Sequence, residues 1–113
     1  MAKRTVPLRP HVRDALAVWG QVIRQGRIDR GWSLAELAAR ANVSDRTVAA
    51  AEAGSPGTAV GTMVDLADLV GIPLFGLEDR AEIALRRRRG EEMLALLPQR
   101  VRRPLNEVAD DDF

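Results

Sequence analysis

GWSLAELAARANVSDRTVAAAEAG, residues 31–54, is the stretch that decides the fold. Ser33 stands near its beginning, and a serine hydroxyl can accept a hydrogen bond from a free N–H at a helix start. Glu36 follows three residues later and completes the capping-box pattern S-x-x-E. Apolar side chains then recur at helical spacing, at Leu34, Leu37, Ala38 and Ala41. The pattern predicts a short helix that begins after Ser33 and ends near Ala41.

The second half of the stretch predicts another short helix after a tight turn. Asn42-Val43-Ser44 interrupts the first helix, and Ser44 can cap a second helix over residues 45–53. Gly54 suits the left-handed conformation that ends many helices. Two short helices joined by such a turn form a helix-turn-helix, whose second helix can enter the major groove of DNA.

Helices are predicted on both sides of this motif. Residues 12–30 show an apolar stripe formed by Ala15, Leu16, Trp19, Val22, Ile23 and Gly26. The opposite face is polar and carries Arg13, Asp14, Gln21, Arg24, Gln25 and Arg27. A further helix is predicted over residues 60–70, with Met63, Leu66, Ala67 and Val70 facing inward. The apolar segment Leu74-Phe75-Gly76-Leu77 is expected to close the core as a short fifth helix or a turn.

The C-terminal part differs in character. Residues 78–97 predict a helix with a charged middle, Arg86-Arg87-Arg88-Arg89, and Pro98 ends it. The expected organisation is a basic arm over residues 1–11, a helix-turn-helix domain over 12–77, a C-terminal helix over 78–97, and a flexible tail over 98–113 that ends acidic. The arm either contacts a DNA minor groove or is a leader without a role. The four arginines either meet a phosphate or acidic partner or form a solvated helix face.

Composition restricts the function classes. The chain has 113 residues, a formal net charge of +1, no cysteine and one histidine, His11. A disulfide or a thiolate metal site is excluded, and one histidine gives little basis for a metal cluster or Ser-His catalysis. The sequence shows no paired carboxylates, phosphate loop or nucleophile constellation. We therefore expect no enzyme, no metal and no cofactor.

Location follows from two further features of the sequence. No apolar run reaches the about 18 residues that a membrane span needs. The N-terminus lacks the apolar core of a signal peptide. We expect a cytoplasmic, nucleoid-associated protein.

The longer sequence WGQVIRQGRIDRGWSLAELAARANVSDRTVAAAEAG carries four short patterns in a fixed order, I-R-x-x-R, G-x-S-x-x-E-L-A, V-S-x-x-T-V and E-x-G. With them, residues 19–77 resemble the XRE (Cro/C1-type) helix-turn-helix family. The resemblance implies an all-α, five-helix lambda-repressor-like DNA-binding domain, here with an additional C-terminal helix and a flexible tail. It also implies a homodimer that binds an inverted-repeat operator in double-stranded DNA.

The C-terminal sequence LALLPQRVRRPLNEVADDDF carries a second resemblance. It is similar to HipB-like antitoxins, which accompany HipA-like kinase toxins. This implies the antitoxin of a type II toxin-antitoxin module, which represses its own operon and neutralises the kinase. The alternatives are a stand-alone XRE-type regulator without a toxin and a degenerate helix-turn-helix that serves as a protein-interaction adaptor.

The candidate DNA-binding residues are Ser33, Ser44, Asp45, Arg46, Thr47, Ala50 and Arg24. Arg46 is the best base reader, because its planar fork matches O6 and N7 of guanine. Thr47 or Ser44 would bind a phosphate or touch a thymine methyl group. Asp45 either interacts with the helix dipole or accepts from a cytosine.

The resemblance also implies an ion pair between Arg24 and Glu52, which would tie the first helix to the second helix of the motif. Leu34 departs from the family, since many members have a glutamine there that can bind phosphate. Trp19 and Trp32 are expected in the core. The residues expected to bind a partner or a second copy are Leu94, Leu97, Val101 and Phe113.

Overall fold

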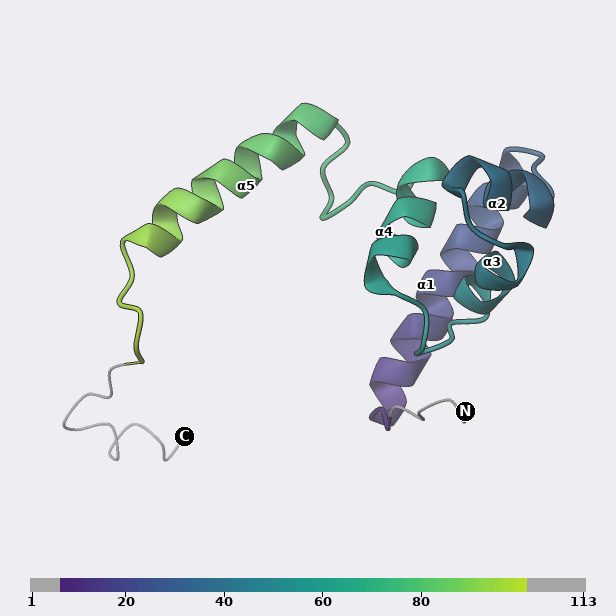
Figure 1. Cartoon of the computed structure of the whole chain (residues 1–113), viewed down its shortest axis with the longest axis horizontal. Helices are drawn as coiled ribbons and strands as arrows, with labels where there is room; N and C mark the ends of the chain where they lie inside the picture. The colour runs from purple at the N-terminus through teal and green to yellow at the C-terminus, as the bar shows by residue number, and fades with distance from the viewer. Residues whose placement is uncertain (1–6, 102–113) are drawn as a thin grey trace. The chain divides into compact units, whose positions relative to one another are not determined.

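The computed structural model describes residues 7–101, and five α-helices account for most of them. They are α1 (Pro10–Asp29), α2 (Leu34–Ala41), α3 (Asp45–Glu52), α4 (Val60–Leu69) and α5 (Arg80–Ala95) (Figure 1). Within the described residues no β-strand is formed, and the all-α class is confirmed. Phe113 and the acidic end of the chain lie outside these residues, as does most of the basic arm.

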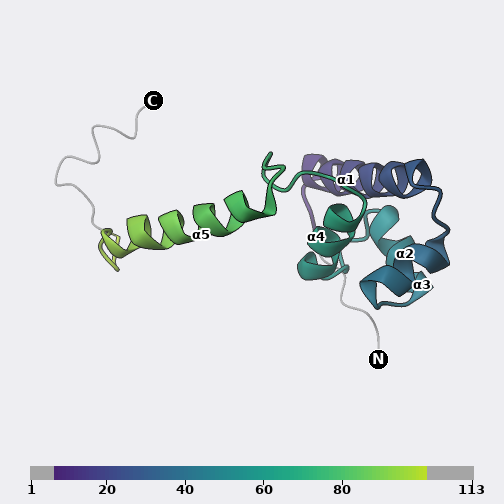
Figure 2. The same ribbon diagram turned by 90° about the horizontal axis from the view of Figure 1, so that it is seen from above.

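The chain divides into two compact units after Glu78. The first unit contains α1 to α4, and the second contains α5. In the first unit α1 lies along one side and packs against α3 and α4, and α2 packs against the same two helices (Figure 2). Fully buried side chains from all four helices meet in one core, the largest being Ile23, Leu37, Val48 and Leu66. Burying each of them contributes about 1.5–3 kcal/mol to folding.

Hydrogen bonds that were predicted from spacing alone define the ends of the two short helices. The Glu36 N–H donates to Oγ of Ser33 at 3.1 Å, and the Ser33 N–H donates to Oε1 of Glu36 at 3.1 Å, so the capping box is confirmed. The Ser44 cap of α3 is also confirmed. Asn42 ends α2 in the left-handed conformation, with φ 57°.

Two glycines let α1 and the end of α3 come into close contact. A Cβ on Gly20 would lie 2.4 Å from the Glu52 carbonyl oxygen. A Cβ on Gly54 would lie 2.7 Å from Cα of Ala17, and Gly54 also has a positive φ of 74°. Any larger residue at either position would push the two helices apart. This contact fixes the distance between α3 and the rest of the core.

The segment after α4 is a turn, one of the two forms expected for it. The Leu77 N–H donates to the Leu74 carbonyl at 2.9 Å. Phe75 and Gly76 between them both have positive φ, 53° and 73°, which no α-helix contains. The first unit therefore has four helices where the resemblance implied five. Leu74 packs against the core, whereas Phe75 is 83% exposed.

Trp32 packs against the core and also supports two arginines. Cζ of Arg40 lies 4.1 Å from the centre of the indole ring, and Cζ of Arg30 lies 5.4 Å from it. Trp19 is half-buried against the same core. The core placement predicted for both tryptophans is confirmed.

Candidate nucleic-acid interface

α3 has one buried and one exposed face, as its predicted role in the major groove requires. Val48 and Ala51 are buried and lie three residues apart, on one side of the helix. Asp45, Arg46 and Ala49 are exposed on the other side. The exposed face thus offers one long cation, one carboxylate and a methyl group. The inward orientation predicted for Val48 is confirmed.

Hydroxyl groups are concentrated at the N-terminal end of α3. The Thr47 N–H donates to Oγ of Ser44 at 3.1 Å, and the two side-chain oxygens are 2.9 Å apart. Both hydroxyls therefore have a structural role within the chain. Asp45 lies in the first turn, where the partial positive charge of the helix favours a carboxylate.

An ion pair fixes the C-terminal end of α3, but its arginine is Arg27 and not Arg24. Nε of Arg27 donates to Oε2 of Glu52 at 2.7 Å, and a second guanidinium nitrogen donates to Oε1 at 3.0 Å. The third nitrogen donates to the Trp32 carbonyl at 2.9 Å. Arg27 therefore joins α1, the turn before α2, and α3. The predicted pair of Arg24 with Glu52 is not formed within residues 7–101.

The position of Arg27 on α1 explains this correction. Arg27 lies four residues after Ile23 and seven after Gly20, and all three are buried on the same helix face. Arg24 follows Ile23 directly, so it is turned about 100° away from that face. Arg27 was assigned to the polar, solvent-facing side, and that assignment was wrong. Val22, assigned to the apolar stripe, is 43% exposed.

Burial makes the Arg27–Glu52 pair important for stability. The two side chains are 11% and 8% exposed, and each guanidinium nitrogen has an acceptor. The hydrogen bonds that Arg27 donates to the Glu52 carboxylate raise the pKa of Arg27 above its ordinary value, although burial acts in the opposite direction. Removing one partner of such a pair strands the other charge and costs about 3–5 kcal/mol.

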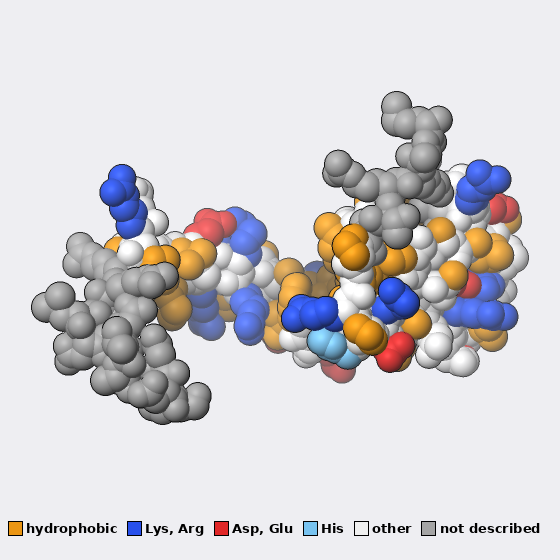
Figure 3. All heavy atoms as spheres, turned by 90° about the horizontal axis from the view of Figure 1, so that it is seen from below, with side chains coloured by type: hydrophobic (Ala, Val, Ile, Leu, Met, Phe, Trp, Pro, Cys, Tyr) orange, Lys and Arg blue, Asp and Glu red, His pale blue; other side chains and the backbone are white. Residues whose placement is uncertain are grey.

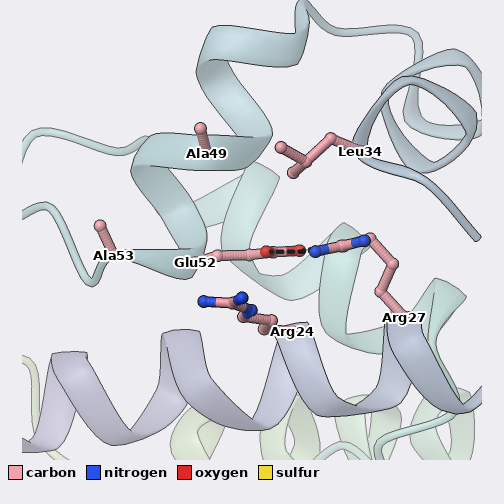
Figure 4. A pocket seen from close by; sticks show the side chains of 6 residues that line it. All are labelled: Arg24, Arg27, Leu34, Ala49, Glu52 and Ala53. Atoms are coloured by element: carbon pink, nitrogen blue, oxygen red, sulfur yellow. Dashed lines mark hydrogen bonds and ion pairs between the residues drawn. The ribbon is translucent and has the colours of Figure 1, made fainter.

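A shallow hollow of about 280 Å³ opens beside this ion pair. Six residues from α1, α2 and the end of α3 line it, namely Arg24, Arg27, Leu34, Ala49, Glu52 and Ala53 (Figure 4). In Figure 4 the guanidinium of Arg24 lies next to Glu52 and points away from Arg27. Within residues 7–101, Arg24 forms no ion pair. The hollow thus combines apolar walls with one exposed cation.

Charge is distributed unevenly between α1 and the rest of the first unit. Residues 33–77 contain two arginines, Arg40 and Arg46, and five acidic residues. Arg40 is stacked on Trp32, which leaves Arg46 as the cation on the exposed side of α3. Most positive charges of this unit belong to α1, at Arg13, Arg24 and Arg27, to Arg30 directly after it, or to the sequence before it.

The structure brings only part of the predicted DNA-binding set together. Ser44, Asp45, Arg46 and Thr47 surround the start of α3, and Ala50 is half-buried further along the helix. Ser33 is exposed at the start of α2, and Arg24 lies in the hollow. Their contacts with DNA stay predictions. The residue that the sequence reasoning missed is Arg27. Its place on the same helix face as Ile23 follows from their spacing of four residues, but its burial depends on Glu52, which lies 25 residues away.

Two other features are absent from the described residues, a membrane-crossing helix and a metal-binding cluster. None of its helices combines the length and the apolar character needed to cross a membrane. Across residues 7–101, no cluster of three or more histidine or acidic side chains is placed to hold a metal ion.

Comparison with known proteins identifies one segment of the first unit. Residues 23–77 match the family model described as helix-turn-helix (HTH_3). The match covers α2, α3, α4 and the second half of α1. No curated protein and no solved structure matches the chain. The match confirms the XRE-type resemblance for the helix-turn-helix segment, which is the DNA-binding part of such regulators, and leaves the HipB-like resemblance untested.

Proposed function

We propose that the protein is a sequence-specific transcriptional repressor that binds an inverted-repeat operator as a homodimer. The observation that supports this best is the helix-turn-helix match over residues 23–77. In this segment α3 is capped at one end, anchored by the Arg27–Glu52 ion pair at the other, and exposed on one face. A recognition helix needs that combination, because base contacts depend on a fixed orientation.

Arg46 is the residue that we propose to read a base. Its side chain is exposed, and it forms no ion pair within residues 7–101. A bidentate contact of arginine with guanine discriminates against the wrong base by about 1–3 kcal/mol. The neighbouring side chains Ala49 and Asp45 offer fewer hydrogen bonds to base edges than Arg46 does. We therefore expect one strongly specified base pair in each half-site.

A homodimer would compensate for the small number of base contacts that each copy makes. The recognition helices of a dimer lie about 34 Å apart and reach two successive major grooves. Phosphate contacts would come chiefly from α1, because residues 33–77 are acidic overall. Binding that depends on several phosphate contacts weakens steeply as salt increases.

The finer part of the proposal is that the protein is the antitoxin of a toxin-antitoxin module and neutralises a HipA-like kinase. Its support is the resemblance of residues 94–113 to HipB-like antitoxins, together with exposed apolar side chains at Leu94, Leu97 and Val101. A stand-alone regulator without a toxin fits the same structure equally well. A kinase-like gene beside this one, followed by co-expression and pull-down, distinguishes the two.

A function of another class has one observation in its favour. The hollow beside α3 has apolar walls at Leu34, Ala49 and Ala53, where a DNA reader would gain more from polar groups. A protein-interaction adaptor would use that hollow for an apolar side chain of a partner. This second candidate predicts no promoter binding.

Footprinting on the protein's own promoter at two salt concentrations tests the proposal. We expect protection at low salt that declines at high salt, and a loss of about 1–3 kcal/mol in binding energy for Arg46→Ala. Arg88→Ala, an arginine of the exposed helix α5, is the matched control and should bind normally. Absence of protection at low salt, with the fold intact by circular dichroism, would refute DNA binding and favour the adaptor.

A further inference from the structure

The hollow beside α3 has an apolar wall that two helices build together. Leu34 comes from α2, Ala49 from α3, and Ala53 follows α3 directly. In Figure 4 the Leu34 side chain extends from α2 toward α3, on the side of Ala49. Single apolar side chains are scattered among basic ones over the surface of this unit, and each alone carries little meaning (Figure 3). Three that line one hollow form a surface that an apolar group can enter.

This apolar wall lies on the same side of α3 as the proposed base reader. Ala49 follows Arg46 by three residues and Ala53 follows it by seven, so the three side chains share one helix face. All three residues are exposed. An orientation of α3 that brings Arg46 to a base edge therefore brings the wall of the hollow into the same groove.

The charges at this surface favour DNA as the occupant of the hollow. Arg24 lines the hollow and Arg46 lies one turn before Ala49, and both arginines are exposed. Neither forms an ion pair within residues 7–101. An apolar hollow beside unpaired cations suits a polyanion that also displays an apolar group. In the major groove of DNA that group is the C5-methyl of thymine, and 5-methylcytosine carries it at the same ring position.

Leu34 makes this feature particular to the present chain. Many relatives have a glutamine at this position, which can bind a phosphate. A leucine side chain has no hydrogen-bonding group, so it cannot make that contact. It offers an apolar surface instead, and apolar side chains are the ones that contact the thymine methyl group. The departure from the family pattern therefore changes which part of DNA this position can recognise.

We infer that the hollow reads the C5-methyl group of a pyrimidine, which packs against Leu34 and Ala49 while Arg46 contacts a guanine. Three residues separate Arg46 from Ala49, a rise of about 4.5 Å along the helix. One base step is about 3.4 Å, so the methylated base lies within about two base pairs of the guanine. The inference rests on the proposed function, because it specifies what the same interface reads.

Replacing single bases of the operator tests the inference, because deoxyuridine differs from thymidine only in lacking the C5-methyl group. The full chain first selects its operator from a pool of random duplexes. Each thymine is then replaced in turn by uracil, each cytosine by 5-methylcytosine, and the affinity is measured by fluorescence anisotropy at one salt concentration. At one position in each half-site we expect loss of the methyl to weaken binding about fourfold, or its addition to tighten binding about fourfold, as for burial of one methylene group. The two arms distinguish thymine from methylated cytosine.

Two variants test whether the hollow is the site of this response. Leu34→Gln removes the apolar wall on α2, and the methyl response should disappear. Leu34 also packs against the core, so Ala49→Gln is the second variant. It changes an exposed residue and fills the hollow with a polar side chain, and it should abolish the response as well. Ala39→Gln, the same change at an exposed position of α2 outside the hollow, is the matched control and should keep the fourfold response.

The possible failures are separate results. If the wild-type chain binds its operator but no base responds to its methyl group, the inference is overturned and the proposed function stands. A methyl response that persists in both Leu34→Gln and Ala49→Gln, or that lies far from the guanine whose preference Arg46→Ala removes, overturns it as well. If no operator is selected, DNA binding itself is refuted together with the inference, and an apolar side chain of a partner protein becomes the occupant to test.

Discussion

α3 and α5 are both α-helices with a side-chain cap at the N-terminus, and they differ in what else holds them. α3 has eight residues, of which two are buried, and its Glu52 is bound to Arg27 of α1. α5 has sixteen residues, none of them buried, and its Arg87–Glu91 ion pair joins two exposed residues of the same helix. The shorter helix is therefore the better anchored one.

The difference teaches that tertiary contacts, and not length, decide how firmly a helix of this chain is fixed. Eight residues are too few for a stable isolated helix, since helix nucleation is costly. α3 depends on its cap, on the core and on Arg27. α5 depends on its own backbone hydrogen bonds, on the Asp79 cap and on the exposed Arg87–Glu91 ion pair. Matched substitutions in the two units test this contrast.

The largest expected difference in stability is between removing the glutamate of a buried arginine–glutamate pair and removing the glutamate of an exposed one. Glu52→Ala leaves Arg27 buried without its carboxylate, and we expect the free energy of unfolding to fall by about 3–5 kcal/mol. Glu91→Ala removes an exposed partner, and we expect a loss below about 1 kcal/mol. Thermal unfolding followed by circular dichroism measures both. If the two substitutions lower the free energy of unfolding equally, the buried pair does not anchor α3 more firmly than the exposed pair holds α5.

Arg24→Ala is the control within the first unit. Arg24 lies beside Glu52 without an ion pair, so we expect little change in the melting temperature. A large loss of stability from Arg24→Ala, with a small one from Glu52→Ala, would mean that the assignment to Arg27 is incorrect.

A smaller effect is expected from two glycine substitutions. Gly20→Ala places a Cβ against the Glu52 carbonyl and separates α1 from α3, at a cost of about 1–3 kcal/mol for overpacking. Gly61→Ala, in α4, has nothing within 4 Å of the new atom. We expect it to be neutral or to stabilise α4, because alanine has the higher helix propensity. Urea unfolding compares the two variants directly.

The smallest effect concerns the caps. Ser33→Ala removes a capping box that is part of the packed unit, and we expect a loss of about 1 kcal/mol in unfolding free energy. Asp79→Ala removes the bond from the Ala81 N–H to the carboxylate that caps α5. We expect it to lower helix content without shifting the cooperative transition of the first unit. A shift of that transition by Asp79→Ala would show that the two units unfold together.

Features that depend on neighbours in the sequence were predictable. The capping box of Ser33 and Glu36, the Ser44 cap and the inward orientation of Val48 all follow from spacings of three or four residues. These are local properties of a helix, and so is the exposed position of Arg46 on α3. The ends and the solvent face of the candidate recognition helix could thus be derived from the sequence.

Features that depend on residues far apart in the sequence were not predictable from spacing. Arg27 was assigned to solvent because hydropathy treats arginine as polar, yet a carboxylate 25 residues away allows its burial. Gly20 carries no apolar signal, although its missing side chain lets α1 approach α3. The turn at Phe75 and Gly76 needs two left-handed residues in succession, which an apolar segment does not indicate.

The position of the two tryptophans has a practical consequence. The chain has two tryptophans and no tyrosine, and both Trp19 and Trp32 pack against the core of the first unit. Intrinsic fluorescence therefore reports on α1 to α4 alone, with the Arg30 and Arg40 guanidinium groups beside the indole of Trp32. Circular dichroism records the helices of both units. An unfolding step that circular dichroism records and tryptophan fluorescence does not can therefore be assigned to α5, without a label and without cutting the chain.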